Sequence, residues 1–282
     1  MLCLYSYETS HYNIYIGSRF RTKNSKSETD FSIELPRSFN VPDGVVAHID
    51  DIVIPVSWST IDERNRNCYF RMYYGSTVVA SNVALVAQNY TGAQFAIELA
   101  LNLNYTALTF TSLLVFECVY ELAENMLAIT LSDTRNEALK ASTPFKLEIL
   151  TDETLSTGSN RIADPRTINT IIRNTTQTFI TEAAPYTCYL DFLQTRNLYL
   201  TSSALASYDI VSNFGIDTII KKIPCTVGYN KLLTQSSGST LDGLDVSKRT
   251  LRFIDFKLVD SSFRKIPFQS SHFSFSIIVI QK

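Results

Sequence analysis

The chain has little charge, little glycine and few of the residues that carry out chemistry. Of its 282 residues, 18% are charged, nine are glycine, three are histidine and one is tryptophan. The formal net charge is −2, so charge alone implies neither nucleic acid nor an anionic membrane as a partner. The hydrophobic fraction of 45% is large enough for a sizeable core, in one large β domain or two small ones.

Paired cysteines are also missing. The five cysteines are odd in number, widely scattered and never spaced as C-x-x-C: Cys3, Cys68, Cys118, Cys188 and Cys225. This pattern excludes a zinc ribbon and a disulfide framework, and it predicts free thiols in a reducing compartment.

No targeting or membrane segment is apparent. The first residues lack a basic stretch followed by a long apolar run, and no apolar window is long enough for a membrane helix. We therefore expect neither a signal peptide nor membrane insertion. Without a secretory signal, the glycosylation sequons at Asn89, Asn104 and Asn174 are interpreted as incidental.

Catalytic and metal-binding motifs are absent from the sequence. The histidines His11, His48 and His272 are isolated, and there is no H-x-H cluster, G-x-S-x-G elbow, H-E-x-x-H helix or P-loop. The adjacent pair Asp50 and Asp51 could suggest a metal site, but neighbouring strand residues point to opposite faces. We predict a protein that has no enzymatic activity, no metal and no cofactor.

Strand patterns fill most of the chain. In 30–35, Phe31 and Ile33 share one face, and in 272–281 the apolar residues alternate with serines. Further candidate strands are 69–74, 76–87, 108–122, 126–132, 145–150, 186–193, 197–203, 216–224 and 251–260. Many strands with few glycines predict an all-β fold, an antiparallel sandwich.

One helix is predicted over 91–104. Thr91 is a good N-cap, and Gln94 three residues later completes a capping box. Phe95, Leu99 and Leu103 follow at helical spacing and form an apolar stripe. The stripe favours a helix that covers one side of a sheet over a cofactor site.

The segment 45–62 changes the parity of its apolar residues half-way. Val45, Ala47 and Ile49 give way after Asp50 and Asp51 to a second set, namely Ile52, Ile54, Val56 and Trp58. A β-bulge at the aspartates would let both sets face one core, and the alternative is a reversing turn over 48–51. We further expect the bulge to mark a corner at which the strand passes from one sheet to the other, with Pro55 limiting its pairing and Trp58 anchoring its far end.

A basic run lies near the start of the chain, and it contains Arg19, Arg21, Lys23 and Lys26. It is interpreted as a solvated segment or as a flexible arm that contacts a neighbouring subunit or packaged nucleic acid.

The order of several sequence blocks resembles the penton, or minor capsid, proteins of virophages and Polinton-like viruses (Maverick, adintovirus and mavirus types). The blocks are "DFSIELP", "IDDIVIPVSWSTID", "NYTGAQFAIELALNLN", "NLYLTSSALAS", "IIKKIPC" and "LRFIDFKLVDSSFRKIPF". In that family the helix block starts with a form of G-x-Y-T, where this chain has Gln88 and Asn89. The late L-R-x-I-P element is similar to "IIKKIPC", with lysine for arginine.

The resemblance implies an upright jelly roll in a virion capsid, with five copies at each five-fold vertex and trimers of the major capsid protein around them. It implies synthesis in the host cytoplasm or nucleus. By analogy, residues 30–67 and 181–282 form the jelly-roll core and 68–180 an inserted or upper β subdomain that carries the helix. Residues 1–29 form an N-terminal arm or edge strand. The four basic residues named above are then candidate assembly contacts.

A different class of function stays open. A lectin-like β-sandwich that binds a host-surface glycan or receptor could stack sugar rings on exposed aromatics such as Tyr73, Tyr74 and Tyr105, although packing in a core or interface would equally use these tyrosines. Pentamers without glycan affinity would favour the capsid reading, and a glycan-binding monomer would favour the alternative.

Overall fold

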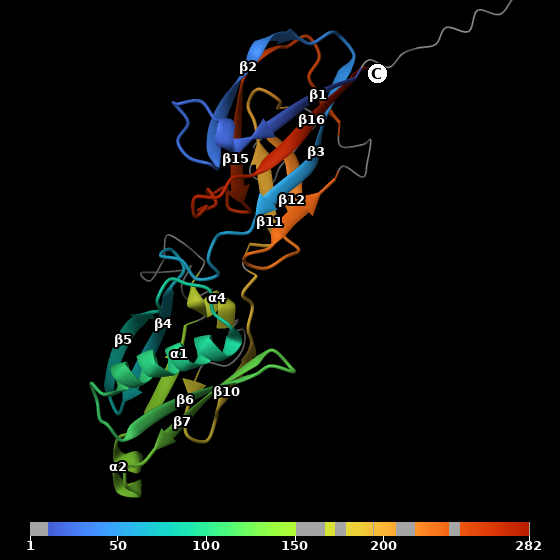
Figure 1. Cartoon of the computed structure of the whole chain (residues 1–282). Helices are drawn as coiled ribbons and strands as arrows, with labels where there is room; N and C mark the ends of the chain where they lie inside the picture. Colours follow the sequence, from blue (N-terminus) through green and yellow to red (C-terminus); the bar gives the residue numbers. More distant parts are fainter. Residues whose placement is uncertain are drawn as a thin grey trace, which may run out of the picture. The chain divides into compact units, whose positions relative to one another are not determined.

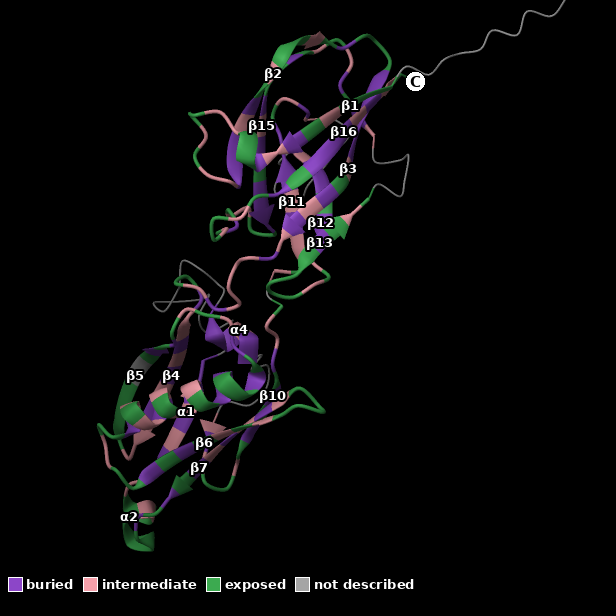
Figure 2. Cartoon of the chain, viewed as in Figure 1, coloured by how far each residue is buried: buried purple, intermediate pink, exposed green. Residues whose placement is uncertain are grey.

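The chain folds into two compact units. The computed structural model describes residues 11–150, 167–172, 179–193, 195–206, 218–236 and 243–281. Unit 1 comprises Met1–Trp58 and Thr195–Lys282, and unit 2 comprises Ser59–Gln194. Each unit encloses its own cluster of buried apolar side chains (Figure 2). Unit 2 is therefore an insertion between two halves of unit 1 that has a core of its own.

Unit 1 is a sandwich of two antiparallel sheets (Figure 1). The first sheet has the order β1-β16-β3-β13, and β14 also pairs with β3; the second has the order β12-β11-β15-β2. The bounds are β1 His11–Gly17, β2 Asp30–Asn40, β3 Val45–Pro55, β11 Asn197–Thr201, β12 Ile219–Pro224, β13 Leu232–Gln235, β14 Leu244–Asp245, β15 Thr250–Asp260 and β16 Ser274–Gln281.

The strand pairs of unit 1 are nested within one another along the chain. β1 pairs with β16, β2 with β15, β3 with β13 and β14, and β11 with β12. The pairs β16–β3 and β15–β11 then complete the two sheets. A long hairpin rolled up in this way is a jelly roll. The predicted all-β antiparallel sandwich is thereby confirmed.

Aromatic side chains from both sheets fill the core of unit 1. Phe31 of β2 and Phe256 of β15 have ring centroids 5.6 Å apart, and Phe256 lies 5.0 Å from Phe275 of β16 in an edge-on contact. Phe256 lies between more exposed neighbours, as Phe31 does, whereas Phe275 is followed by the equally buried Ser276. The inward parity of each strand therefore determines which face packs against the opposite sheet.

The parity change in β3 is a β-bulge, as predicted. Where β16 advances from Ser274 to Ser276, its partners on β3 run from Val53 to Asp50, so β3 carries one extra residue. Asp51 within this step has a φ of +47°. The apolar residues on both sides of the bulge are buried in the same core. The predicted passage to the other sheet was wrong, because β3 keeps β16, β13 and β14 as partners in a single sheet.

The beginning of the described chain is an edge strand rather than a free arm. β1 pairs with β16 along its whole length, from His11 opposite Ile280 to Gly17 opposite Ser274. A 3-10 helix, Ser18–Phe20, follows. The basic segment after it folds back onto the start of β2, because the Thr22 amide donates to the Ser32 carbonyl at 2.8 Å. The segment is therefore bonded to β2 at this point, and its contact with a neighbouring subunit stays a prediction.

Unit 2 combines two smaller antiparallel sheets with helices. One sheet has the order β5-β4-β8-β9 and the other β10-β7-β6. The strands are β4 Asn67–Tyr74, β5 Thr77–Ala84, β6 Leu114–Glu121, β7 Met126–Asp133, β8 Phe145–Ile149, β9 Phe179–Ile180 and β10 Tyr186–Tyr189. The helices are α1 Gly92–Ala107, α2 Glu137–Ser142 and α4 Ile168–Ile172.

The helix α1 begins where the sequence predicts. The Gln94 amide donates to the Thr91 hydroxyl at 3.2 Å, and the Thr91 amide donates to the Gln94 side chain at 3.1 Å, which completes the capping box. The stripe of Phe95, Leu99 and Leu103 is fully buried in the core of unit 2. The helix therefore packs against the sheets, as its sequence indicates.

Asn104 ties the end of α1 to β6. Its side-chain amide donates to the Phe116 carbonyl at 2.8 Å and accepts from the Phe116 amide at 2.6 Å. These are the bonds that a neighbouring strand would make, and β6 is an edge strand of its sheet. The asparagine of this sequon thus has a structural role. The asparagine of another sequon, Asn89, also forms a structural hydrogen bond, because its side chain accepts from the Thr60 amide at 2.9 Å.

The observed boundaries of the insertion differ from those expected. The inserted unit spans Ser59–Gln194, whereas 68–180 was predicted. Residues 181–194 were expected in the jelly-roll core, but β10 pairs with β7 of unit 2. Alternating burial looks the same for a strand of either core, so the sequence pattern alone cannot assign β10 to one of them.

Candidate functional site

The described residues contain no cluster of metal-binding side chains. Within them, no three His, Cys, Asp or Glu side chains lie close enough together to hold a metal ion. His11 is exposed on β1, His48 is buried on β3, and His272 precedes β16. None of the helices in the described ranges is long and apolar enough to cross a membrane.

The thiols of Cys68 and Cys188 in unit 2 are buried, and Cys118 is partly buried. Burial in the core raises the pKa values of Cys68, Cys118 and Cys188 to about 12. These thiols therefore stay protonated at neutral pH, which makes them poor nucleophiles. Cys3, Asn174 and Ile216, which entered the sequence predictions, lie outside the described residues.

The basic segment splits into a bound arginine and three exposed cations. The Arg21 guanidinium donates to the Glu28 carboxylate at 2.9 Å and to the Ser18 carbonyl at 3.3 Å. Arg19, Lys23 and Lys26 are exposed. Arg21 thus braces the loop between β1 and β2, and the other three side chains are available to a partner.

A second surface lies on the outer side of α1. Ile97, Leu101, Tyr105 and Leu108 follow one another at helical spacing, and each is 58–78% exposed. Glu98 is the only charged residue in this helix. We call these four residues the outer stripe of α1. The sequence predictions did not include this outer stripe, although residues 97, 101 and 105 have helical spacing beside the buried stripe.

The three tyrosines proposed for glycan stacking do not share one environment. The Lys146 ammonium lies 4.7 Å from the centroid of the Tyr73 ring, and the Arg135 guanidinium lies 4.9 Å from that of Tyr74. Both tyrosines are partly buried on β4, whereas Tyr105 is exposed on α1. No observation favours a stacking platform built from the three.

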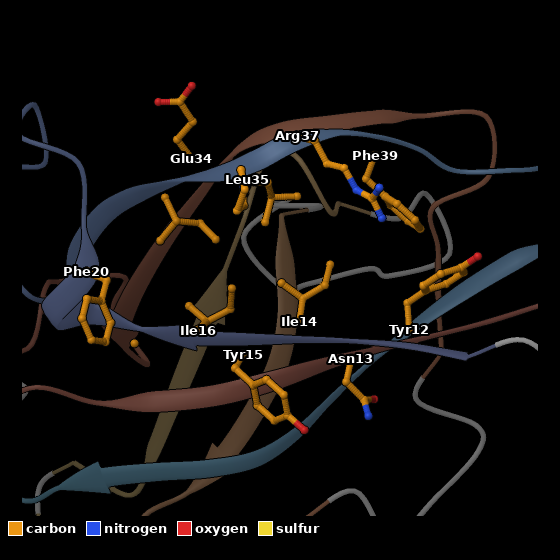
Figure 3. Close-up of a pocket in the computed structure, with 13 residues that line it drawn as sticks. Tyr12, Asn13, Ile14, Tyr15, Ile16, Phe20, Glu34, Leu35, Arg37 and Phe39 are labelled. Carbon is orange, nitrogen blue, oxygen red and sulfur yellow. The ribbon is translucent and has the colours of Figure 1, made fainter.

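A groove of about 610 Å³ lies in unit 1 between β1 and β2 (Figure 3). Its walls are mainly apolar and aromatic. The lining residues are Tyr12, Asn13, Ile14, Tyr15, Ile16, Gly17, Phe20, Ile33, Glu34, Leu35, Pro36, Arg37 and Phe39. The groove escaped the sequence analysis because β1 and β2 belong to different sheets, and only the sandwich fold brings their edges together.

Comparison with known proteins gives a match in fold. No family model matches the sequence, and no curated protein matches it either. Among solved structures, the chain is similar to a crystal structure of the penton protein of mavirus, with a TM-score of 0.53 and 8% sequence identity. The match covers 96% of this chain and 99% of the mavirus chain. The chain therefore has a penton-like fold, which supports the resemblance read from the sequence in this coarser form.

Proposed function

We propose that this protein is a structural component of a viral capsid, of the penton type. The observation that carries the proposal is the extent of the match in fold, which includes 96% of the chain and hence both the jelly roll and the inserted unit. Jelly rolls as such serve many functions. A match that extends over both the sandwich and the inserted unit is more specific than a match to a sandwich alone.

In its full form, the proposal places five copies of the chain at each five-fold vertex of an icosahedral virion. The virion would belong to a virophage or a Polinton-like virus, and trimers of the major capsid protein would surround the vertex. The protein would act without catalysis and without a cofactor. Arg19, Lys23 and Lys26 would contact neighbouring subunits, on a loop braced by Arg21.

A closed ring needs a head-to-tail interface, in which two different patches of one subunit meet those of its neighbours. We assign the outer stripe of α1 to one side of this interface. The stripe is uncharged and well exposed, as expected for the centre of a contact between subunits. In this interface the outer stripe would contact a second copy of this chain.

The mass of the protein in solution tests this proposal. Light scattering coupled to size exclusion, repeated over a range of salt and protein concentrations, should give a particle of five times the 31.8 kDa chain. A stable dimer or trimer would contradict the five-fold arrangement. A monomer that persists at high protein concentration would contradict a ring that assembles by itself.

A further inference from the structure

The groove of unit 1 lies between two strands that each end a sheet. β1 is the last strand of the first sheet on this side, and β2 is the last strand of the second. In the described part of the chain, each has a strand neighbour on one side only. The start of β2 is already bonded by the segment after β1, since the Thr22 amide donates to the Ser32 carbonyl and the Ser32 amide donates to the Ser25 hydroxyl. The outer edge of β1 is the one that offers backbone N–H and C=O groups to another strand.

Side chains of both strands give the groove an apolar floor and aromatic ends. Ile14 and Ile16 of β1 point toward β2 (Figure 3), and Ile33 and Leu35 line the groove from β2. Phe20 stands at one end. At the other end, the rings of Tyr12 and Phe39 meet edge to face with their centroids 5.2 Å apart. The floor therefore suits an extended segment with apolar side chains on one face.

The charged side chains that line the groove are Glu34 and Arg37. Glu34 lines the groove but is bound to Arg252 at 3.0 Å. Arg37, which lines the groove, is exposed and forms no hydrogen bond or ion pair with any described residue. A chain with a net charge of −2 thus presents an exposed arginine in the lining of this groove.

From these features we propose that the groove binds an extended, acidic segment of another protein. The segment would add as a strand to the open edge of β1, place alternate apolar side chains on the aliphatic floor, and set a carboxylate against Arg37. Single-stranded nucleic acid fits less well, because its bases need aromatic faces along the groove, where the floor is aliphatic. The proposal does not rest on the capsid role, since the groove belongs to unit 1 alone.

A labelled peptide provides the test. The probe is a fluorescein-labelled strand of alternating valine and threonine with glutamate at each end, as long as the seven residues of β1. Its binding to the full chain is measured by fluorescence anisotropy. Three comparison ligands are the same peptide with lysine at each end, the peptide N-methylated on the alternate amides that would bond to the edge, and labelled oligothymidylate.

Two matched charge reversals locate the binding. Arg37→Glu alters an exposed side chain, so the fold should persist, and thermal unfolding checks this. Lys222→Glu makes the same charge change on an exposed residue of β12, at the opposite end of the sheet that contains β2. We expect Arg37→Glu to weaken binding of the acidic peptide about tenfold, and Lys222→Glu to leave it unchanged.

Each outcome decides the question. Preference for the acidic peptide, its loss on N-methylation and its dependence on Arg37 would together support strand addition in the groove. Equal binding of acidic and basic peptides, binding that survives N-methylation, or equal effects of the two charge reversals would overturn the proposal. Arg37-dependent binding of oligothymidylate in place of the peptide would assign the groove to nucleic acid instead.

Discussion

At the scale of single residues, Asp133 and Arg135 form an ion pair that is almost closed to water. Arg135 is 4% exposed and Asp133 is 7% exposed. The arginine donates from Nε to Oδ1 at 2.8 Å and from Nη1 to the Thr143 carbonyl at 2.8 Å. Removal of one partner would leave an uncompensated buried charge.

We therefore expect Asp133→Ala to lower the free energy of unfolding by about 3–5 kcal/mol in urea titrations. The matched control is Glu63→Ala, which breaks the exposed pair with Arg66 and should cost less than about 1 kcal/mol. Similar losses in the free energy of unfolding for the two variants would show that the buried ion pair matters no more than the exposed one.

The same pair predicts a dependence on pH. Hydrogen bonds from Arg135 hold the pKa of Asp133 below its ordinary value. Because the folded pKa is the lower one, the contribution of the pair is complete above the unfolded pKa of about 3.9 and is lost as the pH falls through the folded pKa. The stability difference between the native chain and Asp133→Ala should therefore be constant near neutral pH and shrink in acid. A difference that grows in acid would contradict this sign.

Asp51 carries the backbone conformation that the bulge in β3 requires. Its φ of +47° is a left-handed value that glycine adopts freely, aspartate tolerates and β-branched residues resist. Asp51→Val should destabilise the protein by about 1–2 kcal/mol, whereas Asp51→Gly should be tolerated. Asp51 is exposed, so lost burial would not explain the difference. Thermal unfolding of the two variants checks it, and equal stabilities would argue against strain at this position.

At the scale of elements, α1 presents one apolar stripe to the core and another to solvent. If the outer stripe contacts a second copy, Leu101→Glu would place a charge in that contact and should shift the protein from pentamer to monomer in light scattering. Its far-UV spectrum and melting temperature should hardly change, because Leu101 is 60% exposed. Leu139→Glu, on the exposed side of α2, is the control that should leave assembly intact. Pentamers that survive Leu101→Glu would exclude the outer stripe from the interface.

At the scale of the whole molecule, the two cores predict two separable unfolding events. The single tryptophan, Trp58, stacks on Phe268 at 6.0 Å between ring centroids and packs against the core of unit 1. Its fluorescence should therefore follow unit 1, while far-UV circular dichroism follows both units. Leu99→Ala in the core of unit 2 should lower the free energy of unfolding of that unit by about 2–5 kcal/mol. It should shift the circular dichroism transition and leave the fluorescence transition unchanged. A matching shift in fluorescence would mean that the units unfold as one.

Local patterns in the sequence were sufficient to predict local structure. The capping box of Thr91 and Gln94 located the start of α1, and the parity change beside Asp50 and Asp51 located the bulge. Both features depend on neighbours along the chain. The sheet that a strand joins depends on distant residues, so β10 was assigned to the wrong core, and β3 was expected to change sheets when it does not.

The surfaces were harder to predict than the fold. The outer stripe of α1 follows from helical spacing and could have been found in the sequence. The groove could not, because Ile14 and Leu35 meet only after β1 and β2 have joined different sheets. The basic run was recognised, but the ion pair of Arg21 with Glu28, which braces the loop, depends on how the loop closes.

The nested pairing of unit 1 also governs the order in which the protein can fold during translation. β1, β2 and β3 leave the ribosome before unit 2, yet their partners β16, β15 and β13 are synthesised only after it. Unit 2 has all of its strands by then and can fold first. Until β13, β15 and β16 have been synthesised, β1, β2 and β3 expose apolar faces without these partners. A nascent chain is most exposed to aggregation or to a chaperone during this interval.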